Sequence, residues 1–374
     1  MIWGLLSKLI NNTMRIMRKL KETTETLYGS RPYSLLLGDC QKILCALPDE
    51  TVDCVITSPP YWKQRDYDVE EADSDSIIGE EDDSQEYVNR LRAVFAEVKR
   101  VLKQEGSLWL NLGDKYHNKN LMGMPWRVAL ALQEDGWILR NDVIWEKIKG
   151  TQSAKDRLRG AYEHLFHFVK DSKYYYDYEK ILIEPRLLPT VNETSTISAT
   201  GVSGKKYRQQ IQESTQLTER ERKAALKALD ETLEKIRQGE IVDFRMTIRG
   251  NQRTLHSNNG KISGRAKELE QKGFFILSSH AKGYMPSDIW RIVPEDIWRG
   301  DEHYAVFPIE LLERPIRATC PENGVVLDPF MGTGSTIAAA VTYGRRGIGI
   351  DLSRKYLKVA KERLEKLNVQ MTML

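Results

Sequence analysis

An apolar run that stops at two consecutive prolines constrains the fold of this chain more than any other feature. Residues 52–56 read Val-Asp-Cys-Val-Ile, and residues 57–62 read Thr-Ser-Pro-Pro-Tyr-Trp. A run rich in β-branched residues is typical of a buried strand, and proline cannot continue it because it has no backbone N–H. Each proline fixes its own φ, and the second also restricts the residue before it. The segment therefore predicts a strand that ends at a sheet edge and presents rigid carbonyl acceptors there.

These acceptors lie beside a hydroxyl and a flat ring, from Ser58 and Tyr61. The combination suits a planar ring with an exocyclic amino group, such as a nucleobase, although a chance Pro-Pro loop would read the same way. The segment resembles motif IV of the DNA amino-methyltransferases in its Ser-Pro-Pro-Tyr form. The resemblance implies that Ser58, Pro59, Pro60 and Tyr61 are catalytic. It also implies transfer to N4 of cytosine, because Asp or Asn usually holds the serine position in the N6-adenine enzymes.

A second motif occupies residues 325–336, which read Val-Val-Leu-Asp-Pro-Phe-Met-Gly-Thr-Gly-Ser-Thr. We expect a strand over 325–327, a glycine-rich turn that lets the backbone approach a ligand, and a helix over 335–340 with free N–H groups at its start. A further strand over 346–350 ends in Asp351, 23 positions after Asp328. A carboxylate at this place is suited to binding ribose hydroxyls.

The second motif resembles motif I of the S-adenosyl-L-methionine-dependent methyltransferases. This resemblance implies S-adenosyl-L-methionine as the cofactor and assigns the residues of the motif. Asp351 would hold the ribose, and Ser335 and Thr336 would cap the helix near the carboxylate. The methionine and ribose end of the cofactor would be lined by Asp328, Phe330, Gly332 and Gly334.

The catalytic motif precedes the cofactor motif, an order that resembles the β group of DNA amino-methyltransferases. Strands and helices alternate around both motifs, which favours an α/β fold. We therefore expect a Rossmann-like methyltransferase sheet with circularly permuted motif order and an inserted target-recognition region. The expected parts are an N-terminal extension or peripheral helix, a catalytic half, the insertion and a cofactor-binding half, at residues 1–30, 31–184, 185–284 and 285–374.

Several further residues are candidates for the pocket. The resemblance places Asp39 and Cys40 at the adenine end of the cofactor, but Asp39 also reads as an ordinary helix N-cap. It also places Phe307 beside the cofactor, at a helix expected over 304–316. Asp114 follows a strand expected over 106–113, where ligands bind in such sheets. His164 and His167 are expected to be sheet residues rather than catalysts.

The insertion carries a local excess of positive charge. Residues 201–261 contain thirteen Lys or Arg and eight Asp or Glu, with Asn and Gln interleaved. This composition fits phosphate contacts and readout of base edges, although a solvated helical insertion remains an alternative. The predicted DNA-binding residues are Arg245, Arg249, Arg253 and Lys261.

Composition excludes some classes of protein. The four cysteines form no CxxC pair, so we expect no zinc site, no other metal and no disulfide framework. No apolar run is long enough to cross a membrane. Residues 1–29 predict a basic amphipathic helix at DNA or a membrane surface, or else a peripheral helix or an over-long start. Residues 66–86 hold eleven Asp or Glu and no Lys or Arg, and we expect them to face solvent or form a lid.

Together these features predict a site-specific methyltransferase that modifies N4 of cytosine in double-stranded DNA. We expect it in a prokaryotic cytoplasm, held on the nucleoid through DNA, and protecting DNA from a cognate restriction endonuclease. The alternatives are an N6-adenine methyltransferase of the same fold, a methyltransferase of RNA bases or protein glutamine, and a catalytically inactive DNA-binding regulatory module. The recognition sequence, and whether the chain is a monomer or a dimer, stay open.

Overall fold

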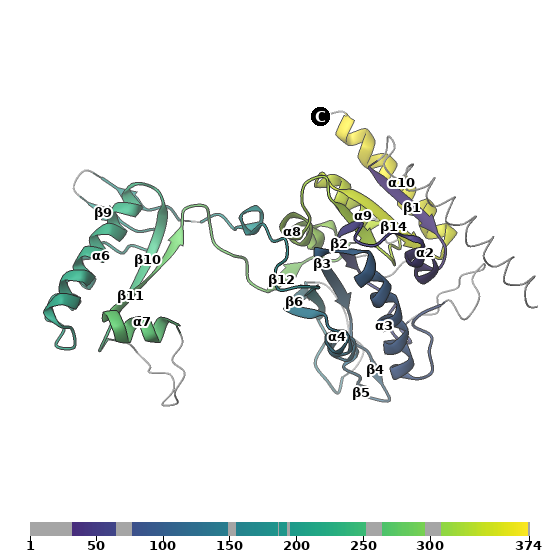
Figure 1. The fold of residues 1–374 in the computed structure, drawn as a ribbon, viewed down its shortest axis with the longest axis horizontal. Coiled ribbons are helices and arrows are strands. Elements are labelled where there is room, and N and C mark those ends of the chain that lie inside the picture. Colours follow the sequence, from purple (N-terminus) through teal and green to yellow (C-terminus); the bar gives the residue numbers. More distant parts are fainter. Residues whose placement is uncertain are drawn as a thin grey trace, which may run out of the picture. The chain divides into compact units, whose positions relative to one another are not determined.

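The chain folds into two compact units (Figure 1). The computed structural model describes residues 32–64, 77–148, 155–185, 187–192, 195–251, 264–295 and 308–372. The first unit combines Met1–Lys180 with Ser287–Leu374, and the second is Ile181–Pro286, close to the insertion expected at 185–284. The expected N-terminal helix at 1–30 lies outside the described residues.

One eight-stranded sheet forms the centre of the first unit. Its first five strands in spatial order run parallel, β7 is antiparallel to both of its neighbours, and β12 is parallel to β6. The α/β class expected from the sequence is confirmed. The spatial order is β1 (Tyr33–Leu37), β14 (Arg346–Asp351), β13 (Val325–Asp328), β2 (Val52–Thr57), β3 (Leu102–Leu112), β7 (Tyr162–Val169), β6 (Ile138–Lys147) and β12 (Ile289–Ile292).

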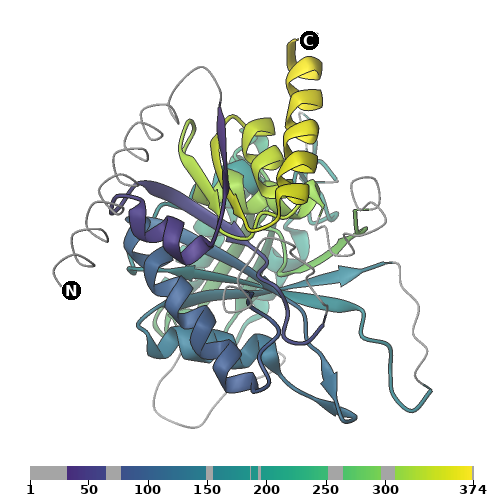
Figure 2. The same ribbon diagram turned by 90° about the vertical axis from the view of Figure 1, so that its right-hand side faces the viewer.

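Helices cover both faces of this sheet (Figure 2). All six residues of β2 are buried, with Cys54 and Ile56 in one apolar cluster and Val55 in the other. This is why the central strands read as continuous apolar runs instead of alternating with polar residues. One face carries α2 (Cys40–Ala46), α3 (Ser84–Val101) and α4 (Met124–Glu134), and the other carries α8 (Ile309–Thr319), α9 (Ser335–Thr342) and α10 (Arg354–Thr372).

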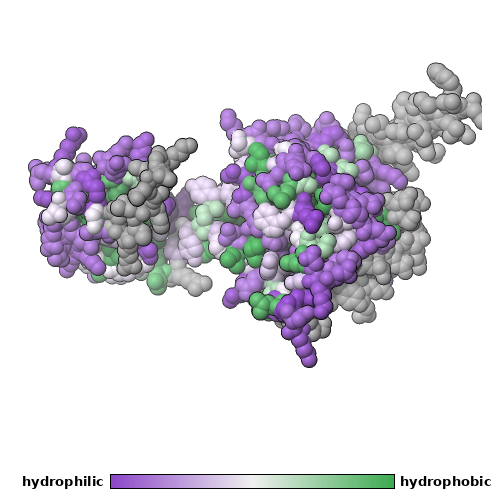
Figure 3. Space-filling model, turned by 90° about the horizontal axis from the view of Figure 1, so that it is seen from below, coloured by the Kyte–Doolittle hydropathy of each residue, from purple (hydrophilic) through white to green (hydrophobic). Residues whose placement is uncertain are grey.

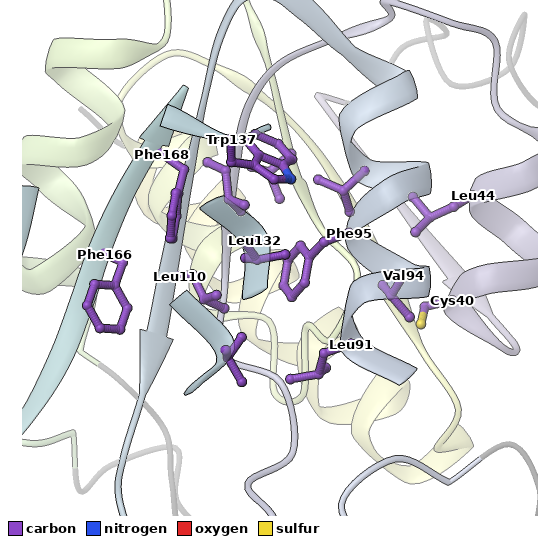
Figure 4. Packing of buried hydrophobic residues seen from close by; sticks show 14 of the residues in the cluster. Cys40, Leu44, Leu91, Val94, Phe95, Leu110, Leu132, Trp137, Phe166 and Phe168 are labelled. Atoms are coloured by element: carbon purple, nitrogen blue, oxygen red, sulfur yellow. The ribbon is translucent and has the colours of Figure 1, made fainter. Parts of the chain in front are cut away.

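The packing of α3 and α4 explains much of the core on their side of the sheet. Phe95 of α3 is fully buried and points toward Leu132 of α4 (Figure 4). Apolar residues recur along α3 at helical spacing and are buried on the face that lies toward the core.

Two element boundaries differ from the sequence prediction. The strand expected over 106–113 begins earlier, because β3 starts at Leu102 directly after α3. The helix expected over 304–316 begins at Ile309, with Pro308 as its N-cap. A short hairpin of β4 (Tyr116–His117) and β5 (Asn120–Leu121) follows β3.

The second unit has its own core around a two-stranded antiparallel ribbon of β10 (Ile241–Ile248) and β11 (Phe274–His280). One face of the ribbon packs against α5 (Lys205–Glu213) and α6 (Glu219–Arg237). Helix α6 is rich in charged residues, and a capping box of Thr218 and Glu221 fixes its start. The short 3-10 helix η2 (Tyr178–Ile181) spans the point in the sequence where the first unit ends and the second begins. The remaining elements of the second unit are β8 (Thr190–Val191), β9 (Thr196–Ile197) and α7 (Gly264–Lys272).

The surface in Figure 3 is mostly hydrophilic, with apolar residues scattered among polar ones. Among the helices that the structure describes, none has the length and apolar character that a membrane span needs.

Two leucines of α4 provide a matched test of this packing. Leu132 is fully buried, whereas Leu130 is 53% exposed on the same helix. We expect Leu132→Ala to lower the free energy of unfolding by about 2–5 kcal/mol, because it leaves a cavity against α3. Leu130→Ala should change it by no more than about 0.5 kcal/mol. Urea denaturation followed by circular dichroism measures both, and equal losses would contradict the assigned packing.

Candidate active site

The two sequence motifs meet at the middle of the sheet. Strands β2 and β13 are parallel neighbours, with Val55 opposite Leu327. The next strand after β2 is β3 on one side, and the next after β13 is β14 on the other. A crevice outside the carboxyl ends of the strands is expected where connections diverge in this way. Residues that follow β2 and β13 therefore share one ligand-binding edge.

A buried carboxylate joins the two strands at this edge. Asp328 Oδ1 accepts a hydrogen bond from Thr57 Oγ1 (2.6 Å) and one from the backbone N–H of Phe330 (3.0 Å). Asp328 Oδ2 accepts from Thr336 Oγ1 (2.6 Å). Burial raises the pKa of Asp328 to about 6, although these three bonds favour the carboxylate. The side chain thus fastens the cofactor motif to the catalytic strand.

The two hydroxyls at the start of α9 do not cap this helix, which corrects the sequence-based expectation. The N-cap is Gly334, and no side chain accepts a hydrogen bond from the first turn. Thr336 instead bonds Asp328, and Ser335 Oγ accepts from Arg363 Nη1 (2.9 Å). Both hydroxyls point into the protein because their partners, Asp328 and Arg363, are buried charged groups.

The glycine-rich turn between β13 and α9 requires glycine at two positions. Gly332 and Gly334 have φ values of 50° and 79°, which side chains rarely adopt. A Cβ on Gly334 would also lie 2.8 Å from the Cβ of Ala360 on α10. The turn packs tightly on α10, and half-buried Phe330 packs on the core on the opposite face.

Asp351 lies beside this turn at the end of β14. Its Oδ2 accepts from the backbone N–H of Gly332 (2.9 Å), and its Oδ1 accepts from that of Ser353 (2.7 Å). Each oxygen keeps a lone pair for a ribose hydroxyl. Burial, with a smaller effect of nearby Asp328, raises the pKa of Asp351 to about 7. The carboxylate and the glycine turn therefore fit the ribose end of a nucleoside cofactor.

The segment after β1 lies next to Asp351, since the N–H of Gly38 donates to the Asp351 carbonyl (2.9 Å). Asp39 is the N-cap of α2, where its Oδ1 accepts from the N–H groups of Gln41 and Lys42. The N-cap alternative is thereby confirmed, and the proposed contact with the cofactor adenine stays a prediction. Burial raises the pKa of the Cys40 thiol to about 12, so it is not a thiolate nucleophile at neutral pH.

Three residues that the sequence placed in the site or on DNA, Phe307, Arg253 and Lys261, lie outside the described residues.

The catalytic segment follows β2, and hydrogen bonds to residues 81–87 hold it in place. The Pro60 carbonyl accepts from Tyr87 Oη (2.9 Å), and Trp62 Nε1 donates to the Glu81 carbonyl (2.8 Å). Pro60 therefore stiffens the turn, and its carbonyl already accepts a hydrogen bond from Tyr87. Ser58 is partly exposed. Glu81 is an exception within the acidic stretch, because its carboxylate is buried and pairs with Arg90 (2.9 Å). The other acidic residues of the stretch that the structure describes are exposed, as expected: Glu80, Asp82, Asp83 and Glu86.

Asp114 is also reassigned by the structure. Its carboxylate accepts from the backbone N–H groups of Lys115, Gly123 and Met124 at 2.8, 3.0 and 3.1 Å. These bonds fix the turn after β3 and the start of α4, so the side chain has a structural role. His167 is a sheet residue, as expected: it is buried and stacked on Trp109 at 4.2 Å.

A cluster of polar side chains around Tyr61 was missed from the sequence. Tyr61 Oη donates to Glu163 Oε2 (2.9 Å), and Asn111 Nδ2 donates to both of these oxygens (2.8 Å each). Glu163 also pairs with Lys147. Burial opposes ionisation of Glu163, but Lys147 and the hydrogen bonds outweigh it and hold the pKa of Glu163 below its usual value.

The strand directions explain why this cluster forms and why it was missed. Asn111 lies near the carboxyl end of β3 and Lys147 ends β6, whereas Glu163 lies at the start of β7. Since β7 is antiparallel to both neighbours, its start lies at the same edge as their ends. The useful signal is a carboxylate at the start of an antiparallel strand, which requires knowledge of the strand direction.

Comparisons with known proteins agree with this geometry. A family model described as DNA methylase, for the N6 and N4 methyltransferases, matches residues 52–362. The chain belongs to the N6/N4 DNA methylase family. It is therefore an S-adenosyl-L-methionine-dependent DNA methyltransferase of the restriction-modification type, and the resemblance stated from the two motifs is confirmed.

Relatives that match this methyltransferase over most of their length include type II methyltransferases. M.SfiI of Streptomyces fimbriatus is 30% identical over 383 residues, covering 87% of this chain and 89% of the relative. M.Cfr9I of Citrobacter freundii is 29% identical and covers 92% of this chain and 93% of the relative. The solved structure of PvuII DNA methyltransferase (cytosine-N4-specific) has the same fold, with a TM-score of 0.54 at 16% identity over 91% of this chain and 92% of that one.

The pKa of Asp351 gives a test of its role. We expect the affinity for S-adenosyl-L-methionine to fall as the pH falls below about 7, by up to about tenfold per pH unit, because protonation removes the negative charge and one of the lone pairs that can accept from the ribose. Isothermal titration calorimetry across this range measures the dependence. Asp351→Asn has no carboxyl to titrate, so its affinity should be lower and should lack this component. Parallel pH profiles for the two proteins would contradict the assignment.

Proposed function

We propose that this methyltransferase transfers the methyl group to N4 of cytosine in double-stranded DNA. The observation that carries the proposal is Ser58, which follows β2 at the switch point, beside the cofactor turn. A neutral hydroxyl occupies this place instead of a carboxylate or carboxamide. The second motif supports the same site. Thr57, the residue before Ser58, donates a hydrogen bond to Asp328 of that motif.

The chemistry required of the chain is positioning of a weak nucleophile. The lone pair of a cytosine amino group is delocalised into the ring, so acceptors placed out of the ring plane are needed to make the nitrogen pyramidal. We assign Ser58 Oγ and the Pro59 carbonyl as the acceptors of the two amino hydrogens. When bound, S-adenosyl-L-methionine supplies the methyl group at its sulfonium. The protein contributes orientation and a fixed electrostatic environment and needs no strong base.

The target base has to leave the duplex to reach Ser58. Flipping a base costs a few kcal/mol, and stacking on an aromatic ring offsets roughly 1–3 kcal/mol of it. Tyr61 is the proposed stacking residue. The residue is 9% exposed, and the edge of its ring lies against Gly113, where an added Cβ would come within 2.7 Å of the ring. The ring is thus held in one position before the base arrives.

We assign target recognition to the outward face of the β10–β11 ribbon in the second unit. Phe244, Met246 and Ile248 of β10 belong to the core of this unit, so the alternate residues point outward. The outward residues include exposed Arg245, which is opposite Leu277 in the register. A two-stranded ribbon fits the DNA major groove, where arginine reads guanine.

Arg249, in contrast, is removed from the proposed DNA contacts. Its guanidinium donates to the carbonyls of Gln216 (2.8 Å) and Glu270 (2.9 Å) and pairs with Glu221 (2.6 Å). These bonds join the start of α6 to the ends of α7 and β10. The side chain was predicted to bind DNA because a sequence does not show which arginines are already engaged.

We further infer that the enzyme acts in the cytoplasm and protects host DNA from a cognate restriction endonuclease. The support is its similarity over most of its length to type II methyltransferases. Such an enzyme methylates the same sequence that its partner nuclease cuts.

Nucleoside mass spectrometry tests the proposed product. DNA from a methylation-free host that expresses the chain should contain N4-methylcytosine, and DNA from a host expressing Ser58→Ala should contain about 100-fold less or none. The variant should still bind S-adenosyl-L-methionine in calorimetry, because Ser58 is not placed at the cofactor. N6-methyladenine in the wild-type sample would instead support the adenine alternative, and equal marks from both proteins would reject the role of Ser58.

A pair of arginine variants tests the ribbon. Arg245→Ala should weaken binding to the methylated sequence, once sequencing has identified it, by about 1–3 kcal/mol. Arg220 is also an exposed arginine but lies on α6, outside the ribbon, so Arg220→Ala should have little effect. Fluorescence anisotropy with cognate and scrambled duplexes separates the two. An equal loss for both variants would indicate non-specific attraction only.

A further inference from the structure

A chain of hydrogen bonds leads away from Ser58, and its direction is fixed by one charge. Ser58 Oγ and Tyr61 Oη are 3.1 Å apart, and Tyr61 Oη is 2.9 Å from Glu163 Oε2. Lys147 pairs with the other oxygen of Glu163. The residues come from the turn after β2, the end of β6 and the start of β7, so the chain of hydrogen bonds crosses the binding edge of the sheet.

The number of hydrogens in this chain determines which atom donates at each step. An ionised carboxylate can only accept, so Tyr61 uses its one hydroxyl hydrogen on Glu163. Tyr61 can then only accept from Ser58, and Ser58 uses its one hydrogen on Tyr61. The Ser58 hydroxyl is left with its lone pairs and no hydrogen for the substrate.

Asn111 reinforces this direction. Its Nδ2 donates to Tyr61 Oη and to Glu163 Oε2 at 2.8 Å each, and it also lies 3.4 Å from Ser58 Oγ, toward which an amide nitrogen can only donate. The opposite orientation of the amide would place its carbonyl against the carboxylate. Asn111 Oδ1 is buried and has no hydrogen-bond partner among the described residues. Such an unpaired buried acceptor costs stability, and the network therefore holds Asn111 in place despite that cost.

We propose that Glu163 is a positioning residue that, through Tyr61, orients the Ser58 hydroxyl as an obligate acceptor and so selects bases with an exocyclic amino group. The proposal rests on the proposed function in placing Ser58 at that group. A cytosine amino group offers hydrogens to the free lone pairs. Thymine offers an oxygen at the same place, and two acceptors without a hydrogen repel each other.

The charge on Glu163 is the part of the chain on which the selection depends. Its pKa is held below the usual value, chiefly by Lys147 acting against burial, so the carboxylate is ionised at neutral pH. Successive hydrogen bonds polarise one another at low local dielectric, so the charge also makes Ser58 Oγ a stronger acceptor. Tyr61 accordingly has two separate roles, through its ring and through its hydroxyl.

The Tyr61→Phe variant separates these roles, because it keeps the ring and breaks the chain. Glu163 retains Lys147 and Asn111, so the fold should survive. We expect kcat to fall about 10- to 100-fold, the range for a lost hydrogen bond to a charged group. The KM for DNA should stay within about twofold, because uniform binding is unchanged. Tyr343→Phe is the matched control: this tyrosine hydrogen-bonds Glu313 outside the site, and its loss should leave kcat unchanged.

A double-mutant cycle shows whether Tyr61 and Glu163 act through Ser58. In a Ser58→Ala background, Tyr61→Phe or Glu163→Gln should reduce single-turnover rates no further, whereas a purely structural effect would add to that of Ser58→Ala. Wild-type kcat for Tyr61→Phe, or a raised KM with unchanged kcat, would overturn the proposal and leave only a stacking role. The identity of the mark made by the wild type tests the proposed function separately, since cytosine and adenine both carry the amino group.

Discussion

The carboxylate of Asp328, buried between two threonine hydroxyls, is the interaction on which the rest of the site depends. Thr57 belongs to the strand that carries the catalytic turn, and Thr336 belongs to the helix that follows the cofactor turn. A buried carboxyl group without partners would cost several kcal/mol, so the three hydrogen bonds to Asp328 also determine how the two segments approach each other. The acceptors near Ser58 and the turn at Gly332 and Gly334 are consequently held in one relative position.

The order and direction of the strands turn this joint into a site. Parallel strands bring the ends of β2, β13 and β14 to one edge of the sheet, where Ser58 and Asp351 both lie. The antiparallel strand β7 adds Glu163 at that edge, and β6 adds Lys147 beside it. An ionised group and its counterion are thus held where a neutral hydroxyl has to act as an acceptor. Rigid strand ends suit this purpose because the chemistry requires orientation more than proton transfer.

Under the proposed function, methyl transfer belongs to the first unit and target recognition to the second. Each unit has its own apolar core, so the residues of the second unit can change without disturbing the catalytic sheet. Within the second unit, Arg249 stabilises the fold by joining three elements, whereas Arg245 is exposed on the ribbon. Two arginines four residues apart on one segment therefore have different roles, and only the pattern of hydrogen bonds distinguishes them.

The sequence by itself determined the class of fold, the permuted order of the motifs and the positions of both turns. Prolines and glycines restrict the backbone locally, and the apolar runs mark buried strands, so neither depends on distant residues. Only the tertiary structure decided what each polar side chain bonds. Asp114 and Arg249 proved structural, Thr336 bonds Asp328 instead of capping its helix, and Glu163 joined the site. The physical reason is that hydrogen bonds and ion pairs act over a few ångströms, and the direction of a neighbouring strand determines which groups come that close.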